Sequence, residues 1–189
     1  MLIELVNKTL ALGTIVSQVG MVVLAGYFLM YRKKKNPVVA FLGRHGMLLA
    51  FLVVLFSVLG SLFYSRIAGF APCDLCWYQR IFMYPQLILL GMALLKKPFG
   101  TTQGGDYHII DYALVLCTIG FWVSVYQNYM YYFNQGLNAQ CLLSGMQLSC
   151  IKRYVFEFGY VTIPVMSLTA FVLTMVFLLL FKFHHKFHN

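Results

Sequence analysis

Five apolar runs separated by short polar connections dominate this 189-residue sequence. Residues 9–31 alone would form about 34 Å of helix at ~1.5 Å per residue, against a bilayer hydrocarbon core about 30 Å thick. With 61% hydrophobic and only 10% charged residues, the composition excludes an ordinary soluble globule. We therefore predict an all-α integral membrane protein. Its expected spans are residues 9–31, 46–65, 77–95, 109–133 and 161–181, with a short connection at 36–45.

The distribution of the basic residues indicates how the chain is oriented in the membrane. The net charge of +9 comes from short basic runs between the apolar stretches, so it does not indicate a nucleic-acid-binding face. The first span is followed by a basic run, unlike a cleaved signal peptide, and is expected to be retained with its N-terminus outside. Five spans then place nine lysines and arginines on one side and four on the other, with Arg80 inside a span. The positive-inside rule puts Cys73, Cys76, Cys141 and Cys150 on the extracytoplasmic side, where disulfides persist.

A C-x-x-C motif, Cys73 to Cys76, stands where a loop enters the third span. Two thiols at this spacing can form a reactive disulfide or supply half of a zinc site, and a helix start favours the thiolate. Arg80 follows Cys76 by one helical turn, and an arginine inside a span is costly. It could extend to the outer interface, or it could stabilise the Cys76 thiolate and negative charge on a bound quinone. Trp77, Met83 and Tyr84 lie at the same level and could line such a pocket.

A second cysteine pair, Cys141 and Cys150, encloses eight residues of the longest polar connection. The pair could be a structural staple, or it could exchange disulfides with the C-x-x-C, because thiolate attack passes a disulfide between pairs without a cofactor. A four-thiolate zinc site fits the spacing of the second pair poorly. The fifth cysteine, Cys117, lies mid-span and is expected to be a small buried side chain. Asp111 is either a helix-start residue, which we expect, or one member of a polar pair.

Two sequence segments carry a family resemblance. The segment C-D-L-C-W-Y-Q-R-I-F-M-Y-P (residues 73–85) closely resembles the DsbB family of disulfide-bond oxidases, in particular its BdbC-like branch. The segment F-G-Y-V-T-I-P-V-M-S-L (residues 158–168) is similar to the start of that branch's last span. The resemblance covers residues 46–181. In the vitamin K epoxide reductases, a sister family, the quinone-linked C-x-x-C follows the loop cysteines, whereas here it comes first.

The resemblance implies a four-helix transmembrane bundle in a bacterial cytoplasmic membrane, with the C-x-x-C beside a ubiquinone or menaquinone. Cys73 and Cys76 would be the quinone-linked pair, with Cys76 facing the quinone and Arg80 the matching arginine. Cys141 and Cys150 would oxidise a DsbA-like thioredoxin-fold partner, with Cys141 forming the mixed disulfide.

We therefore expect a membrane thiol:quinone oxidoreductase that reoxidises this partner. The expected organisation is an extra N-terminal helix with a basic cytoplasmic loop (residues 1–45), a four-helix core (46–181) and a cytoplasmic tail (182–189). The competing hypothesis is a structural or assembly membrane protein stapled by two disulfides.

Overall fold

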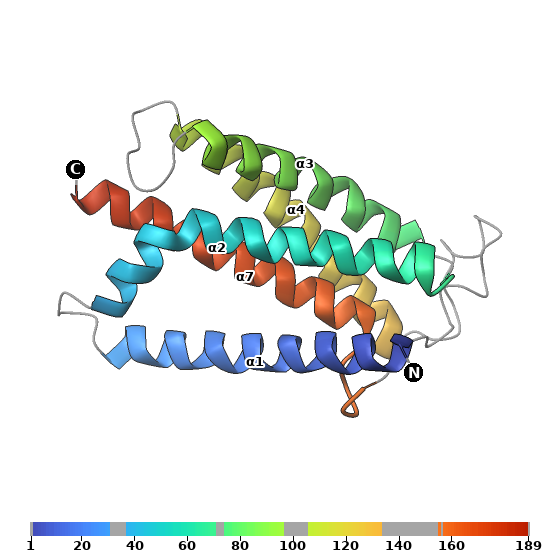
Figure 1. The fold of residues 1–189 in the computed structure, drawn as a ribbon. Coiled ribbons are helices and arrows are strands. Elements are labelled where there is room, and N and C mark those ends of the chain that lie inside the picture. Colours follow the sequence, from blue (N-terminus) through green and yellow to red (C-terminus); the bar gives the residue numbers. More distant parts are fainter. Residues whose placement is uncertain are drawn as a thin grey trace.

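The computed structural model describes residues 2–30, 37–70, 74–96, 106–133, 155 and 157–188. These residues form five α-helices and one π-helical turn, η1, which continues the second helix (Figure 1). The only strand-like feature among the described residues is one isolated bridge between Glu157 and Val161. The prediction of an all-α protein is therefore confirmed. The elements are α1 (Leu2–Met30), α2 (Pro37–Leu62), η1 (Phe63–Ile67), α3 (Asp74–Lys96), α4 (Asp106–Phe133) and α7 (Ile163–His188).

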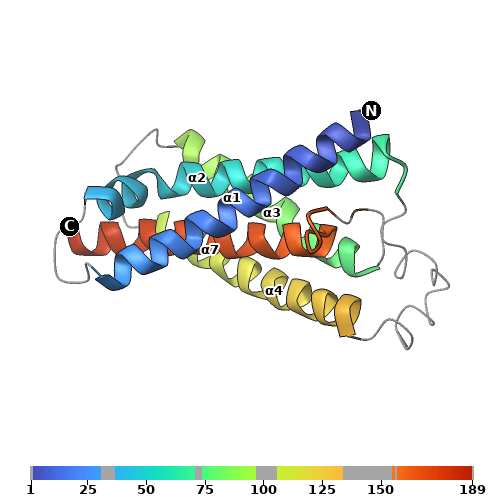
Figure 2. The same ribbon diagram turned by 90° about the horizontal axis from the view of Figure 1, so that it is seen from below.

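Four of the helices form a closed bundle and the fifth lies outside it. Helix α2 packs against α7 and α3, and α4 packs against α3 and α7. Helix α1 runs diagonally across the outside of α2 and α7 (Figure 2). This arrangement confirms the predicted four-helix bundle with one additional N-terminal helix. Its buried core is apolar and draws on all four bundle helices; it includes Val54, Val58, Met83, Leu90, Ile110, Cys117, Phe171 and Leu178.

The helices define a multi-pass membrane protein. Residues 3–27, 41–66, 108–133 and 163–185 form helices that are long and apolar enough to cross a bilayer. Helix α3, expected as a span at 77–95, is about 34 Å long at ~1.5 Å per residue but is less apolar than the other four. Its polar side chains Gln79, Arg80 and Gln86 are buried, so they face the other helices. Polar residues within a membrane bundle are expected on such inward faces.

The expected connection at 36–45 is wrong for residues 37–45, which form the first turns of α2. Pro37 occupies the first helical position, where its missing N–H costs nothing. Gly43 and Gly46 do not break the helix. They are places where α7 approaches closely: a Cβ on Gly46 would lie 2.6 Å from the carbonyl oxygen of Phe177. The glycines therefore serve helix packing, which a turn-based interpretation of the sequence misses.

The last helix also extends beyond its expected end at residue 181 and continues through His188. Lys182 Nζ forms an ion pair with Asp111 Oδ1 of α4. Asp111 lies within α4, which begins at Asp106, so it is a paired polar group instead of a helix-start residue. The pair links α4 to α7 at the end of the bundle opposite the start of α3 (Figure 1).

A tight turn before α7 ties three helices together. Phe158 and Gly159 have positive φ angles of 52° and 79°, and Glu157 and Val161 exchange backbone hydrogen bonds around them. The Tyr132 hydroxyl of α4 donates to the carbonyl of Tyr160 at 2.7 Å. The Tyr160 hydroxyl donates in turn to Gln18 Oε1 of α1 at 2.8 Å. The turn thus fixes α1 and α4 relative to the start of α7.

Candidate functional site: a thiol beside an interhelical cavity

Helix α3 begins at Asp74 and places Cys76 in its first turn, next to α4. Gln127 of α4 donates from Nε2 to the Cys76 sulfur at 3.2 Å. Gln79, one turn after Cys76, donates from Nε2 to Gln127 Oε1 at 2.5 Å. Both glutamines are buried, so this amide chain holds one N–H donor on the sulfur within the bundle. A donor at sulfur favours the negatively charged thiolate over the thiol.

Arg80 is held inside the bundle by the end of α2. Its Nε donates to the Ser61 hydroxyl at 2.7 Å and its Nη2 donates to the Ser61 carbonyl at 3.0 Å. The guanidinium carbon lies 5.3 Å from the ring centroid of Trp77, within range of a cation–π interaction. Only 9% of Arg80 is exposed. The arginine is therefore fixed within the bundle and is not extended over the protein surface.

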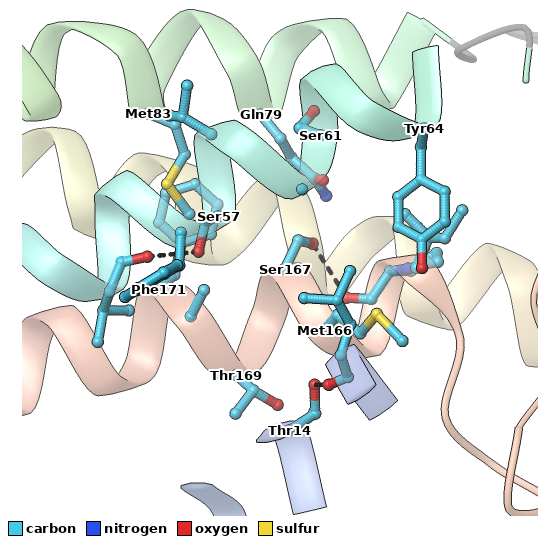
Figure 3. Close-up of a pocket in the computed structure, with 18 of the residues that line it drawn as sticks. Thr14, Ser57, Ser61, Tyr64, Gln79, Met83, Met166, Ser167, Thr169 and Phe171 are labelled. Carbon is cyan, nitrogen blue, oxygen red and sulfur yellow. Dashed lines mark hydrogen bonds between the residues drawn. The ribbon is translucent and has the colours of Figure 1, made fainter. Parts of the chain in front are cut away.

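One cavity of about 630 Å³ is lined by the thiol, both amides and the arginine. Figure 3 shows part of its lining, including Gln79, Ser61 and Tyr64. Cys76, Gln79 and Arg80 line it from α3, and Gln127 lines it from α4. Most of its remaining wall is apolar or carries small hydroxyl side chains. Cavities of 300–1,000 Å³ with a few convergent polar groups are typical of small-molecule sites. Met83 and Tyr84 also line the cavity from α3. Further lining residues lie on α1, α2, η1 and α7, among them Gly13, Ser57, Tyr64, Met166 and Phe171.

Tyr64 brings a buried polar group to the same cavity. It lies in η1 and points toward α7 with its hydroxyl leading (Figure 3). Its ring stacks on Phe70, with centroids 5.8 Å apart and planes 11° apart. Only 6% of the residue is exposed, and the hydroxyl has no hydrogen-bond partner within the described part of the chain. A buried hydroxyl without a partner is costly, so a ligand that accepts its hydrogen bond would find a donor already in place.

The structure brings two predicted site residues together. Cys76 and Arg80 line one cavity, as do Met83 and Tyr84. Trp77 is half exposed and lies against the Arg80 guanidinium. The remaining predicted site residues, Cys73, Cys141 and Cys150, lie outside the described residues.

Sequence reasoning missed four residues of the site. Gln127, Ser61 and Tyr64 belong to no motif, and Gln79 lies in the segment 73–85 without a role that its position in the motif would indicate. One available signal was polarity: a glutamine within an apolar span is costly in a bilayer unless it has a partner. The pairing of Gln127 with Cys76 could not be deduced this way, because the two residues come from different helices.

The fold and the site together define the class of protein. It is a multi-pass membrane protein whose helices place a cysteine, an arginine and two hydrogen-bonded glutamines around one cavity. The family model described as "Disulfide bond formation protein DsbB" matches residues 43–181. The chain therefore belongs to the DsbB family.

Curated relatives agree with this assignment. The chain is 36% identical over 138 residues to disulfide bond formation protein C of Bacillus subtilis, covering 70% of this chain and 89% of the relative. It is 40% identical over 126 residues to the SPbeta prophage-derived disulfide bond formation protein B of the same organism, covering 67% and 78%. No solved structure was found to match this chain. The protein is thus a membrane protein of a bacterial disulfide-bond-forming family, and helix α1 precedes the residues matched by that family.

Proposed function

We propose that this protein is a thiol:quinone oxidoreductase that reoxidises a DsbA-like thioredoxin-fold disulfide catalyst. The observation that carries the proposal is the Cys76 sulfur, which borders a ligand-sized cavity together with Arg80. Membership of the DsbB family and the names of the relatives support a role in disulfide bond formation. The use of a quinone as electron acceptor and of a DsbA-like protein as electron donor are our further inferences.

The proposed electron path begins at the partner. Its two thiols lose two electrons and two protons as its disulfide forms, and the Cys141–Cys150 disulfide takes them up through a mixed disulfide at Cys141. Exchange with the Cys73–Cys76 disulfide then reoxidises Cys141 and Cys150 and leaves Cys73 and Cys76 as thiols. A bound quinone would supply the acceptor for two electrons and two protons and leave as the quinol.

The residues around Cys76 suit this chemistry. Gln127 holds an N–H on the sulfur, which favours the thiolate that takes part in exchange. Arg80 keeps a fixed positive charge on the same cavity because two of its donors are held by Ser61. Tyr64 offers a hydroxyl donor for a carbonyl oxygen, since this hydroxyl has no hydrogen-bond partner in the part of the chain that the structure describes. The cavity therefore combines apolar walls with two donors, as a quinone ring requires, and these groups would hold either a ubiquinone or a menaquinone.

We further propose that the protein lies in the cytoplasmic membrane with both cysteine pairs on the extracytoplasmic side. The distribution of lysine and arginine supports this orientation. In the structure the N-terminus lies at the same end of the bundle as the start of α3, as expected if both face outward (Figure 1). Disulfide exchange with a secreted partner requires this side, because the cytoplasm keeps thiols reduced.

The decisive assay uses purified protein in detergent with a reduced thioredoxin-fold dithiol and a soluble short-chain quinone. We expect quinone absorbance to fall in proportion to the dithiol oxidised. Cys76→Ala should abolish this reaction, because α3 would then contribute no thiol to the cavity wall. Cys117→Ala is the matched control: the Cys117 sulfur is buried and donates to the carbonyl of Phe171, so its loss should leave turnover intact.

Two outcomes would contradict the proposal. Turnover that survives Cys76→Ala would show that electrons reach the quinone without this thiol. Absence of turnover with several quinones and partners, together with disulfides that resist mild reductant, would favour the stapled structural protein.

A further inference from the structure

Helix α1 forms one wall of the cavity that Cys76 and Arg80 border. Thr9, Leu10, Gly13, Thr14 and Ser17 all line it. Positions 9, 13 and 17 are spaced by four residues and so follow one face of a helix. This helix lies before the residues matched by the DsbB family, so the family comparison assigns it no role.

Specific contacts hold α1 on the bundle. Leu10 approaches α2 where Gly60 lacks a side chain: a Cβ there would lie 3.6 Å from Leu10 Cδ1. Two turns further along, Gln18 donates to Thr169 Oγ1 of α7 at 2.9 Å and accepts from the Tyr160 hydroxyl. Between these contacts, a Cβ on Gly13 would meet nothing within 4 Å. Helix α1 is thus fastened at Leu10 and at Gln18, with open space beside Gly13.

The cavity opens to the outside of the protein where its lining residues are exposed. On α1, Thr9 and Gly13 line the cavity and are also exposed. On α2, Phe56 lines it and is 62% exposed. The wall on α3 is closed by comparison, because Gln79 and Arg80 are buried there. The cavity therefore opens sideways between α1 and α2, both of which are long and apolar enough to lie in a bilayer.

We propose that α1 completes the quinone site and that the opening between α1 and α2 passes the prenyl tail into the hydrocarbon layer. This inference rests on the proposed function. The buried part of the cavity carries polar groups and suits a ring with carbonyl oxygens. These groups include the Tyr64 hydroxyl, which has no hydrogen-bond partner among the residues that the structure describes. The outer part is lined by Gly13 and Phe56 and suits an apolar chain that stays out of water. A ligand with a polar head and an apolar tail fits both ends at once.

The test compares two identical substitutions on α1. A leucine at position 13 would project into the open space beside the cavity, whereas Gly20 has equally open surroundings but does not line the cavity. Both Gly13→Leu and Gly20→Leu replace an exposed helical glycine, so both gain the same helix propensity. Binding is followed by quenching of Trp77 fluorescence in a Trp122→Phe background, which needs no partner and no turnover. The ligands are a prenylated benzoquinone, a prenylated naphthoquinone and the same two quinones without tails.

We expect Gly13→Leu to weaken binding of the prenylated quinone about tenfold, because the added side chain takes the space of several methylene groups. Binding of the tail-less form should change by less than about threefold, and Gly20→Leu should leave both unchanged. Equal dissociation constants in Gly13→Leu and Gly20→Leu would overturn the proposal. If Gly13→Leu weakens binding of the prenylated and the tail-less quinones equally, the proposal is also overturned, because the leucine side chain would then interfere with binding of the quinone ring and not of the tail.

The same measurements separate this inference from the function on which it rests. If the unchanged protein binds quinones but catalyses no dithiol oxidation, the proposed function is wrong, and the comparison at positions 13 and 20 still decides the role of α1. If the unchanged protein shows no quenching by any of the four quinones, both proposals are overturned.

Discussion

At the scale of single residues, Gln127 donates a hydrogen bond from Nε2 to the Cys76 sulfur at 3.2 Å. We expect Gln127→Leu to slow alkylation of reduced Cys76 by iodoacetamide about tenfold, because a hydrogen bond to a charged group contributes about 1.5–3 kcal/mol. The rate is measured by mass spectrometry of the peptide that carries Cys76.

The matched control for this variant is Gln86→Leu. Gln86 is also a buried glutamine, but its amide atoms have no hydrogen-bond partner among the residues described, so it cannot act on the sulfur in the same way. Alkylation at the unchanged rate in Gln127→Leu would show that this amide does not support the thiolate.

Arg80 allows a second prediction at the scale of one residue. Arg80→Ala removes the positive charge from the cavity and leaves the Ser61 hydroxyl and carbonyl without their donor. We expect a tenfold or greater rise, on the order of 1.4 kcal/mol or more, in the KM for quinone, with little change in the KM for the dithiol partner. Arg66→Ala is the control, because Arg66 is exposed and does not line the cavity. Normal quinone kinetics in Arg80→Ala would remove the arginine from the proposed site.

Tyr64 should behave differently from Arg80, because its hydroxyl has no partner in the described part of the protein. Tyr64→Phe removes an unsatisfied buried group, so we expect unchanged or higher thermal stability together with a threefold to tenfold rise in quinone KM, for a hydrogen bond worth about 0.5–1.5 kcal/mol. The exposed Tyr78 supplies the control, Tyr78→Phe. Lower thermal stability of Tyr64→Phe with an unchanged quinone KM would contradict this prediction and would mean that the hydroxyl stabilises the fold.

At the scale of elements, the bundle depends on close approach between α4 and α7. Gly120 faces the ring of Phe171, and a Cβ added to Gly120 would overlap that ring. Phe171 is fully buried, and its carbonyl also accepts from the Cys117 sulfur at 3.1 Å. Since α4 carries Gln127, the separation of these two helices also affects where the amide meets Cys76.

Gly120→Ala should therefore destabilise the protein by about 1–3 kcal/mol, the usual cost of overpacking a filled core. Thermal unfolding in detergent measures this effect against Gly20→Ala, where the added methyl group meets nothing within 4 Å. An equal melting temperature in the two variants would show that α4 and α7 can separate at no cost.

At the scale of the whole molecule, the prediction concerns sidedness. After reduction of intact spheroplasts, a membrane-impermeant maleimide should label cysteines of both pairs without permeabilisation, and it should not reach Cys117, which is fully buried. A cysteine introduced by His188→Cys, at the far end of α7, should react only after permeabilisation. Labelling of His188→Cys in intact spheroplasts would reverse the orientation deduced from the basic residues.

The sequence by itself determined the membrane class, the approximate helices and the position of Cys76 and Arg80 at the start of α3. These features are local: hydrophobic length, basic flanks and motif spacing each depend on residues close together in the chain. Local reasoning failed at residues 37–45, because proline and glycine suggest a connection by themselves. Here Pro37 begins a helix, and Gly43 lies where α7 approaches α2 closely.

Only the tertiary structure decided which groups surround the cavity. Gln127 reaches Cys76 from another helix, Ser61 comes from the end of α2, and Tyr64 comes from η1. Gly13 belongs to a helix outside the bundle. Their meeting depends on how the five helices pack and rotate against one another. Helices that span a bilayer need apolar side chains both toward lipid and toward one another, so their composition does not indicate which helix faces are in contact.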